Sequence, residues 1–187
     1  MRLEIASAAA IKYACTYFHY MKRVPSSMVA FSVFNASGDW AGVIIYALGA
    51  SRRLAGSVGF AQGQVFELVR VALNGKQEST GKAIAISLRL LKRHAPLCKA
   101  VVSFADPDQG HKGVIYQATN WIYLGKMKNQ VEYLLDGKPR HGRSIGSKIG
   151  SVKGLKTVPI SGKHKYVYPL QPETRRIFEK MKRPFPK

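Results

Sequence analysis

The segment from Val102 to Gly125 gathers many side chains that can take part in chemistry. It reads V-S-F-A-D-P-D-Q-G-H-K-G-V-I-Y-Q-A-T-N-W-I-Y-L-G and holds two aspartates, a histidine, two tyrosines and an asparagine. Aspartate and histidine transfer protons or bind metals, and a tyrosine hydroxyl can donate a proton. The apolar run before Asp106 predicts a strand, and the carboxyl ends of strands in open α/β sheets commonly carry ligand sites. We therefore interpret this turn as part of a functional site.

Asp106 is the candidate site carboxylate, because it directly follows the expected strand and precedes a proline that stiffens the turn. It could act as a general base or as a metal ligand. The alternative is a turn cap, which is a common role for Asp in such a turn. We assign the cap to Asp108 and the function to Asp106. Tyr116, on the helix expected next, is a candidate acid, with core packing as its alternative.

Arg70 lies inside the apolar run Q-V-F-E-L-V-R-V-A-L, where a charge is costly unless it is paired. Glu67 is three residues away and would point to the opposite face of a regular strand. The sequence therefore predicts another partner for Arg70, which could be Asp106, a phosphate or a cofactor.

Hydrophobic periodicity and turn residues predict the elements that must position these side chains. Helices are expected at Leu3 to Phe18, about Ser79 to His94, about Gly110 to Thr119, and in P-E-T-R-R-I-F-E-K-M-K-R. Strands are expected at Met28 to Phe34, Trp40 to Leu48, Gln64 to Leu73, Lys99 to Phe104, Trp121 to Lys126 and Val131 to Leu135, with a strand-like K-H-K-Y-V-Y-P-L near the end. This alternation predicts an α/β (α+β) domain.

The charge of the chain points to a polyanionic partner. Thirty Lys and Arg stand against ten Asp and Glu, for a formal net charge of +20 and a pI of about 10.2. Like charges in this excess repel one another in the folded chain, and a polyanionic partner would neutralise them. Nucleic acid is the first candidate, and an anionic membrane surface is the second. We discard the membrane, because the sequence shows no spanning apolar run, lipidation motif or long basic amphipathic helix. Cys15 and Cys98 lack C-x-x-C spacing, so we expect buried free thiols in a reducing cytoplasm.

Composition changes after Asp136, where the chain becomes rich in Lys, Arg, Gly and Ser. We expect a body at residues 1–136 and a basic C-terminal extension at 137–187. The extension could be a disordered tail, but the strand-like segment after Lys163 favours an arm that returns to the body. Cations expected to contact DNA lie in three regions: Lys22 and Arg23; Arg52 and Arg53; and Arg140, Arg143, Lys148 and Lys163.

The order of elements resembles GNAT-like acyltransferases, in which a mixed central sheet is flanked by helices and a helix N-terminus holds a pyrophosphate. The matching loop here is Q-E-S-T-G-K-A, so Ser79, Thr80, Gly81 and Lys82 are candidate cofactor-binding residues. Glu78 stands where that superfamily usually has Gln or Arg. The alternative is an ordinary helix N-cap at Ser79 or Thr80.

Three segments resemble the Mom DNA-modification proteins of bacteriophage Mu and related phages: H-Y-M-K-R-V-P, F-E-L-V-R-V-A-L-N and A-D-P-D-Q-G-H-K-G-V-I-Y-Q-A-T-N-W-I-Y-L-G. The resemblance covers about Tyr17 to Leu135. It implies a GNAT-like fold and a transferase that converts the exocyclic amine of adenine in double-stranded DNA to a methylcarbamoyl (acetamido-type) derivative. Phage DNA would then resist restriction in the cytoplasm of the infected host.

The resemblance also implies functions for two residues near the N-terminus. His19 and Tyr20 match the family's His-Tyr pair, so His19 could act in acid–base chemistry or bind a metal, and Tyr20 could donate a proton. With Arg70, Asp106 and Tyr116 they form the expected catalytic set. His19 and Asp106, with His111, could instead bind iron, while acetyl-CoA is a possible acyl donor. Asn120 is a further candidate site residue, ranked below this catalytic set.

A target adenine would have to leave the helix stack, with Trp40, Tyr46 and Trp121 as possible pocket walls. Two other interpretations stay open: an acetyltransferase that acts on a protein or a small amine, and a DNA-binding protein without enzymatic activity.

Overall fold

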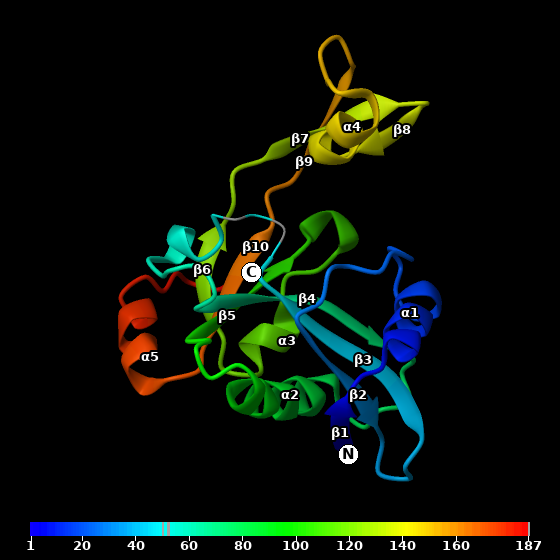
Figure 1. The fold of residues 1–187 in the computed structure, drawn as a ribbon. Coiled ribbons are helices and arrows are strands. Elements are labelled where there is room, and N and C mark those ends of the chain that lie inside the picture. The colour runs from blue at the N-terminus through cyan, green and yellow to red at the C-terminus, as the bar shows by residue number, and fades with distance from the viewer. Residues whose placement is uncertain (50, 52, 187) are drawn as a thin grey trace.

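A seven-stranded mixed sheet forms the body of the computed structural model, which describes residues 1–49, 51 and 53–186 (Figure 1). The strands are ordered β1-β2-β3-β4-β5-β10-β6. They comprise β1 (Arg2–Ile5), β2 (Val29–Phe34), β3 (Trp40–Ala47), β4 (Val65–Leu73), β5 (Ala100–Ala105), β6 (Ile122–Lys126) and β10 (His164–Pro169). All neighbouring strands in the sheet run antiparallel except β4 and β5. The expected α/β class with a mixed central sheet is therefore confirmed.

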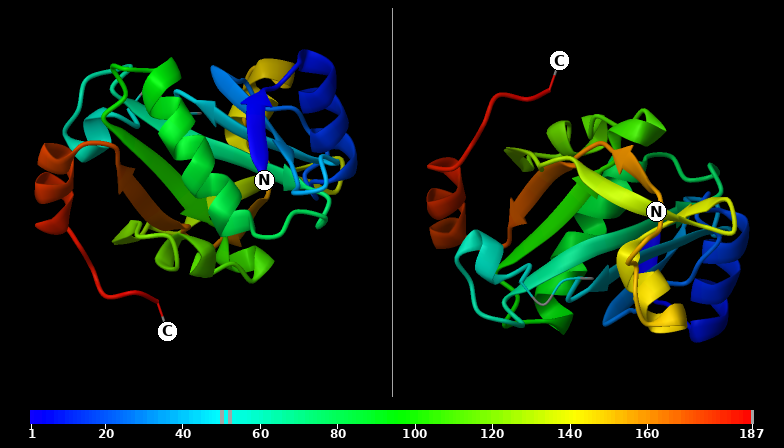
Figure 2. Two further views of the ribbon diagram at one scale, coloured as in Figure 1. Left: turned by 90° about the horizontal axis from the view of Figure 1, so that it is seen from below. Right: turned by 90° about the horizontal axis from the view of Figure 1, so that it is seen from above.

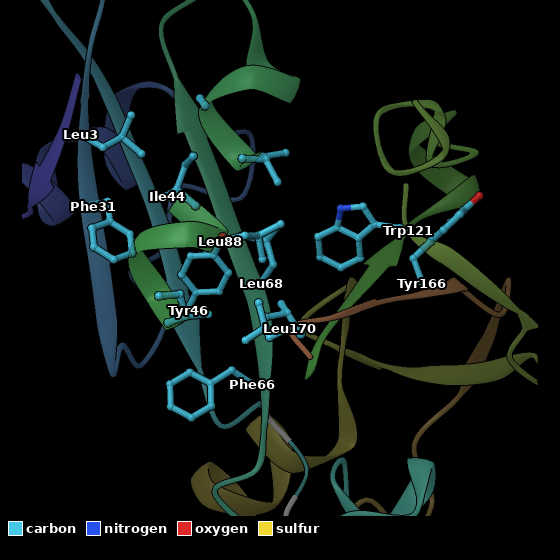
Figure 3. Packing of buried hydrophobic residues seen from close by; sticks show 14 of the residues in the cluster. Leu3, Phe31, Ile44, Tyr46, Phe66, Leu68, Leu88, Trp121, Tyr166 and Leu170 are labelled. Atoms are coloured by element: carbon cyan, nitrogen blue, oxygen red, sulfur yellow. The ribbon is translucent and has the colours of Figure 1, made fainter. Parts of the chain in front are cut away.

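Helices cover both faces of this sheet. On one face, α2 (Thr80–His94) and α3 (Val114–Gln117) pack on a core that includes Phe31, Tyr46 and Leu68 (Figure 3). On the other face, α1 (Ala8–Tyr17) and α5 (Pro172–Glu179) cover separate apolar clusters. Figure 2 shows α1 and α5 at opposite ends of the sheet. The apolar residues of the strands thus alternate between two helical layers.

Side-chain caps fix the starts of the two longer helices. The hydroxyl of Ser7 accepts the backbone N–H of Ala10 at α1, and the hydroxyl of Ser79 accepts that of Lys82 at α2. Each cap satisfies a backbone donor that has no partner within its helix. The expected helix at Leu3 to Phe18 is wrong in its first turn, because Arg2–Ile5 pair with β2 as edge strand β1. That pairing depends on a distant strand, which local periodicity does not reveal.

Strands β4 and β5 pair over only three residues before they separate. Their parallel register joins Val65–Glu67 to Ala100–Val102. Strand β4 also contains a bulge, because Ile45 of β3 pairs with Arg70 while Tyr46 pairs with Leu68. The extra residue, Val69, shifts the alternation of side chains along the strand.

The bulge corrects one sequence-based expectation. Leu68 and Val71 pack on the same core cluster although they are three residues apart. By the same shift, Glu67 and Arg70 lie on the same face of β4, not on opposite faces as a regular strand would place them. Arg70 consequently faces the α1 side of the sheet.

Residues 127–163 form a small subdomain, called the arm below, between β6 and β10. It contains β7 (Gln130–Leu135), β8 (Lys138–Arg140), β9 (Thr157–Ile160) and α4 (Gly142–Ile149), with the strands in the order β8-β7-β9. Figure 1 shows the arm projecting from the body on two connecting segments. Ile145 of α4 is fully buried against this small sheet. Within the basic extension expected from residue 137, β8, α4 and β9 are therefore ordered elements.

The chain after the arm returns to the body. Strand β10 pairs with both β5 and β6, so the segment that follows the arm completes the central sheet.

The expected helix at about Gly110 to Thr119 is shorter, since a 3-10 turn (Pro107–Gln109) precedes α3. Cys15 and Cys98 are buried free thiols, as expected. Among the described residues, no helix is long and apolar enough to span a membrane.

Candidate functional site

The separation of β4 and β5 opens the sheet beside Tyr116. The Ser103 hydroxyl, on β5, lies 2.8 Å from the Tyr116 hydroxyl and 3.3 Å from the carbonyl oxygen of Leu68 on β4. Burial raises the pKa of Tyr116. The phenol therefore stays protonated near neutral pH and can donate a proton. The Tyr116 hydroxyl, supplied by α3, thus lies beside the gap between the two diverging strands.

An aromatic cluster surrounds Tyr116 and holds its ring. The Tyr116 ring centroid lies 4.9 Å from that of Trp121 and 5.1 Å from that of Tyr166. Figure 3 shows Trp121 and Tyr166 on the opposite side of the core from Leu3 and Phe31. The Tyr166 hydroxyl donates to the carbonyl of Lys112 at 2.6 Å and so fixes the entry to α3. Gly113, in left-handed conformation, has no room for a side chain because a Cβ would lie 2.4 Å from the Tyr166 ring.

His19 and Arg70 meet on the opposite face of the sheet. Nη1 of Arg70 lies 3.0 Å from Nδ1 and 3.2 Å from Nε2 of His19. The bulge in β4 turns Arg70 toward this face, and the loop that follows α1 supplies His19. The sequence placed both residues in the site but did not foresee that His19 is the partner of Arg70.

His19 is uncharged at neutral pH. Desolvation lowers its pKa to about 4, helped by the positive charge of Arg70 and by the neighbouring His111. The backbone N–H of Met21 donates to Nδ1 at 3.1 Å. A nitrogen that accepts this bond carries no proton, so we assign the proton of the neutral ring to Nε2. His19 therefore presents a hydrogen-bond donor next to a guanidinium.

Asp106 caps the 3-10 turn that follows β5. One carboxylate oxygen accepts the N–H of Asp108 at 3.1 Å, and the other lies 3.0 Å from the Lys163 ammonium. The assignment of the cap to Asp108 is therefore wrong. Asp108 instead accepts the N–H of Ser161 at 2.9 Å and so reaches the base of the arm. Both aspartates connect the turn to residues that lie more than fifty positions away in the sequence.

The expected iron site does not fit this geometry. Both ring nitrogens of His19 face the Arg70 guanidinium, and the Asp106 carboxylate is bonded to Lys163. Within residues 1–49, 51 and 53–186, no three His, Cys, Asp or Glu side chains cluster as a metal-binding group. The donors proposed for iron are thus bound to cations of the chain itself, and no step is derived through a metal.

The start of α2 has the form of an N-cap. Ser79 holds the cap position, and the Thr80 hydroxyl accepts from the Gln77 side chain at 3.0 Å. Glu78 turns its carboxylate to the N–H of Ala36. A Cβ on Gly81 would lie 3.0 Å from the Thr119 methyl group, so α2 begins close to the end of α3. The N-cap interpretation is confirmed for Ser79.

The cations expected to contact DNA occupy separate parts of the structure. Lys22 and Arg23 are exposed after α1, and Arg53 is exposed before the 3-10 turn Gly56–Val58. Three others belong to the arm: Arg140 on β8, Lys148 at the end of α4, and Lys163 beside Asp106. Arg52 and the side chain of Arg143 lie outside the described part of the chain.

Two of the expected pocket walls are core residues instead. Tyr46 is fully buried, with its hydroxyl 2.6 Å from that of Ser87, and Trp121 is only 2% exposed. Trp40 is half-buried against Phe18.

Sequence reasoning overlooked Ser103, although a serine within the apolar strand K-A-V-V-S-F was a visible signal.

Solved structures of other proteins share this fold. The mixed sheet and its flanking helices are similar to those of solved acetyltransferases. An acetyltransferase of Bacillus subtilis solved with CoA has a TM-score of 0.52 and 10% identity, covering 91% of this chain and 99% of that one. A spermidine N-acetyltransferase of Vibrio cholerae, in a chimera with its human counterpart, has a TM-score of 0.52 and 8% identity, covering 90% and 95%. These likenesses show the fold.

The family follows from the sequence. The model of the Mom protein family matches residues 1–187, and the chain belongs to this family. It is 32% identical over 80 residues to the methylcarbamoylase Mom of Escherichia phage Mu. That alignment covers 42% of this chain and 33% of the phage Mu protein, so the match spans about a third of the relative's length.

Proposed function

We propose that the chain is a DNA-modifying transferase that converts the exocyclic amine of adenine to a methylcarbamoyl (acetamido-type) derivative. The modification would protect phage DNA from restriction in the host cytoplasm. Membership of the Mom family, the name of the phage Mu relative and the net charge of +20 support this reaction and a DNA substrate. The observation that carries the proposal is the contact of neutral His19 with Arg70.

His19 and Arg70 would stabilise negative charge in the reaction. When an amine attacks a carbonyl carbon, charge builds on the carbonyl oxygen, and fixed donors aimed at that oxygen lower the barrier. The guanidinium and the Nε2–H of His19 supply such donors side by side. The low pKa of His19 keeps the ring neutral, so it does not repel Arg70.

Tyr116 lies on the other face of the sheet from His19 and Arg70, and the gap between β4 and β5 connects it to their side. Burial is the main cause of its raised pKa, and Glu67 and Tyr20, which belong to the His19 side, also contribute. Tyr116 would therefore act as the proton donor to the leaving group. Its raised pKa keeps the proton on the phenol until negative charge develops nearby. Ser103, 2.8 Å away, orients the hydroxyl from β5. Tyr20 is half-exposed, its ring is tilted against that of His19 with centroids 4.4 Å apart, and it would offer this ring to the substrate.

An acyl donor with phosphates, such as acetyl-CoA, fits the N-terminus of α2. The amides of Thr80 and Gly81 precede the first amides bonded within the helix, and the first turn holds no acidic residue. Lys82 adds a positive charge. An acetyl thioester bound there would supply a two-carbon acyl group, and the thiolate released when its C–S bond breaks would take the proton of Tyr116. The methylcarbamoyl group also contains a nitrogen that the acetyl group lacks, so a separate nitrogen donor would have to supply it. Glu78, which turns toward Ala36, replaces the Gln or Arg usual in this loop.

DNA would lie across the cations of the arm and of the loop after α1. The arm and its flanks, residues 126–165, contain ten Lys and Arg but only Glu132 and Asp136 as acidic residues. Phosphates bind such a surface by releasing counterions, independently of sequence. The target adenine would leave the duplex, because its amine is otherwise stacked and paired.

Mass spectrometry of nucleosides from cells that express the chain tests the reaction. We expect a modified deoxyadenosine with the wild-type chain and none with His19→Ala or Arg70→Met. Tyr123→Phe serves as a control, since its hydroxyl bonds His164 Nδ1 at 2.7 Å, away from the His19–Arg70 pair. Unmodified deoxyadenosine with a folded wild-type chain would contradict the proposal.

Acetylation of a small amine is the second candidate, favoured by the likeness to a spermidine N-acetyltransferase. The net charge of +20 disfavours a polycationic substrate, because like charges repel. Incubation of the chain with acetyl-CoA and spermidine separates the two: acetylspermidine without DNA modification would favour this second function.

A further inference from the structure

Two exposed tyrosine rings stand side by side on α1. Tyr13 is 51% exposed and Tyr17 is 68% exposed, and their ring centroids lie 4.6 Å apart. Their spacing of four residues places both rings on one face of the helix. Tyr46, Tyr123 and Tyr166 are buried by contrast. An exposed aromatic surface of two rings, inclined at 42° to one another, is therefore presented to the surroundings at this helix.

Further rings beneath fix this surface. The Tyr13 centroid lies 5.6 Å from Phe18 and 5.8 Å from Trp40, and these two lie 5.5 Å from one another. Tyr13 is thus braced on its inner side, and Tyr17 is the outermost ring. A ring held in one orientation loses little conformational freedom when it stacks on a ligand.

The paired rings adjoin the proposed active site. Tyr17 precedes His19 by two residues, so their Cα atoms are at most about 7.6 Å apart. Tyr20 continues the aromatic surface, with its ring 4.4 Å from that of His19. The backbone therefore keeps Tyr17 near any ligand that binds at His19.

The charge around the rings identifies the chemistry of the partner. Lys12, Lys22 and Arg23 are exposed on α1 and the loop after it, a segment without acidic residues, while Glu4 lines a hollow beside Tyr13, the inner of the two rings. A polyanion with flat, polarisable rings matches a surface that combines cations with exposed aromatics. Nucleobases stack on such rings with little sequence preference, and the cations attract the phosphates.

We propose that Tyr17, supported by Tyr13, stacks on a nucleobase next to the adenine that is modified. This inference rests on the proposed function, because it places the stacked base beside the target. A base whose neighbour leaves the duplex loses a stacking partner, and the Tyr17 ring replaces it. The Tyr13–Tyr17 pair thus holds the DNA strand open at the site.

Fluorescence of 2-aminopurine tests this stacking directly. The probe is a short duplex with a single adenine flanked on both sides by 2-aminopurine, whose emission is quenched when it stacks. We expect quenching with the wild-type chain and with Tyr17→Phe, which keeps the ring. Tyr17→Ala should lose the quenching and bind about 5- to 150-fold more weakly. Tyr17→Leu, with apolar bulk but no ring, should resemble Tyr17→Ala.

The control is Leu97→Ala, because Leu97 is 79% exposed after the far end of α2. It should bind and quench like the wild-type chain. If folded Tyr17→Ala quenches the probe as the wild-type chain does, the inference is overturned. The proposed function is unaffected by that result as long as the wild-type chain binds DNA in a salt-dependent way. A changed oligomeric state of Tyr17→Ala with unchanged DNA binding also overturns it. A wild-type chain that binds no duplex overturns both.

Discussion

Oδ2 of Asp106 lies 3.0 Å from the ammonium nitrogen of Lys163, which joins the turn after β5 to the base of the arm. Asp108 adds a second connection through the N–H of Ser161. The carbonyl of Asp106 also accepts the N–H of His111, whose side chain helps to lower the pKa of His19. A single turn therefore contacts both the arm and the candidate site.

Asp108→Ala should loosen the base of the arm without unfolding the body. The variant removes the acceptor of the Ser161 N–H, and the Ser161 hydroxyl also bonds this carboxylate. We expect faster amide hydrogen exchange at Ser161, with unchanged exchange at Val167 in the buried strand β10. Glu132→Ala, on β7 of the arm, is the matched control. Equal exchange at Ser161 in both variants would show that Asp108 does not anchor the arm.

Arg70→Met should raise the pKa of His19 from about 4, because it removes a positive charge that disfavours protonation. The pKa should stay below 6.5, since desolvation is the largest cause of the shift and persists. Histidine ring NMR during an acid titration measures this value. A His19 pKa that is the same in both proteins would disprove the electrostatic contact.

The same shift makes stability depend on pH. His19 titrates near 6.5 in the unfolded chain and near 4 in the folded chain, so the unfolded chain takes up the proton first as pH falls. The free energy of unfolding should therefore decrease between about pH 6.5 and 4. After allowance for the partial exposure of His19, the loss should be on the order of 1 kcal/mol. Denaturant unfolding of the wild-type chain and of His19→Gln across this range measures the difference.

Tyr116→Phe should reduce the rate of modification by about 10²- to 10⁴-fold, the range for loss of a general acid. The stability cost should be only about 1 kcal/mol, because the Ser103 hydroxyl keeps the Leu68 carbonyl as a partner. Tyr123→Phe also loses a buried hydroxyl bond and should be destabilised similarly, yet retain activity. Similar rates for the two variants would remove Tyr116 from the catalytic set.

DNA affinity should fall steeply with salt, and the arm should account for part of that slope. Replacing Arg140 and Lys148 by Ala removes two cations of the arm. If each contacts a phosphate, the slope of log K against log salt becomes shallower by about 0.9 per contact. Lys180→Ala with Lys182→Ala removes two cations at α5, at the other end of the sheet. Equal slopes for both double variants would show that the arm does not contact the phosphates.

Local pattern was sufficient for much of this protein. The strands from Met28 to Phe104 and the helix ending at His94 were predicted within a few residues, because alternation and helical periodicity record which side chains are buried. The net charge and the density of reactive side chains after Phe104 were likewise sequence properties. These features depend on residues close together in the chain.

Tertiary structure alone decided which of those side chains meet. Arg70 and His19 are separated by 51 positions, and Asp108 and Ser161 by 53. The first contact needs the bulge at Val69, which reverses the face of Arg70, and the second needs the arm to return beside the turn. Bulges and long loop closures depend on strand register and on packing between distant segments, which no local pattern contains. The sequence by itself determined the elements and the available chemistry, whereas the fold determined that Asp106 caps its turn and that His19 contacts Arg70.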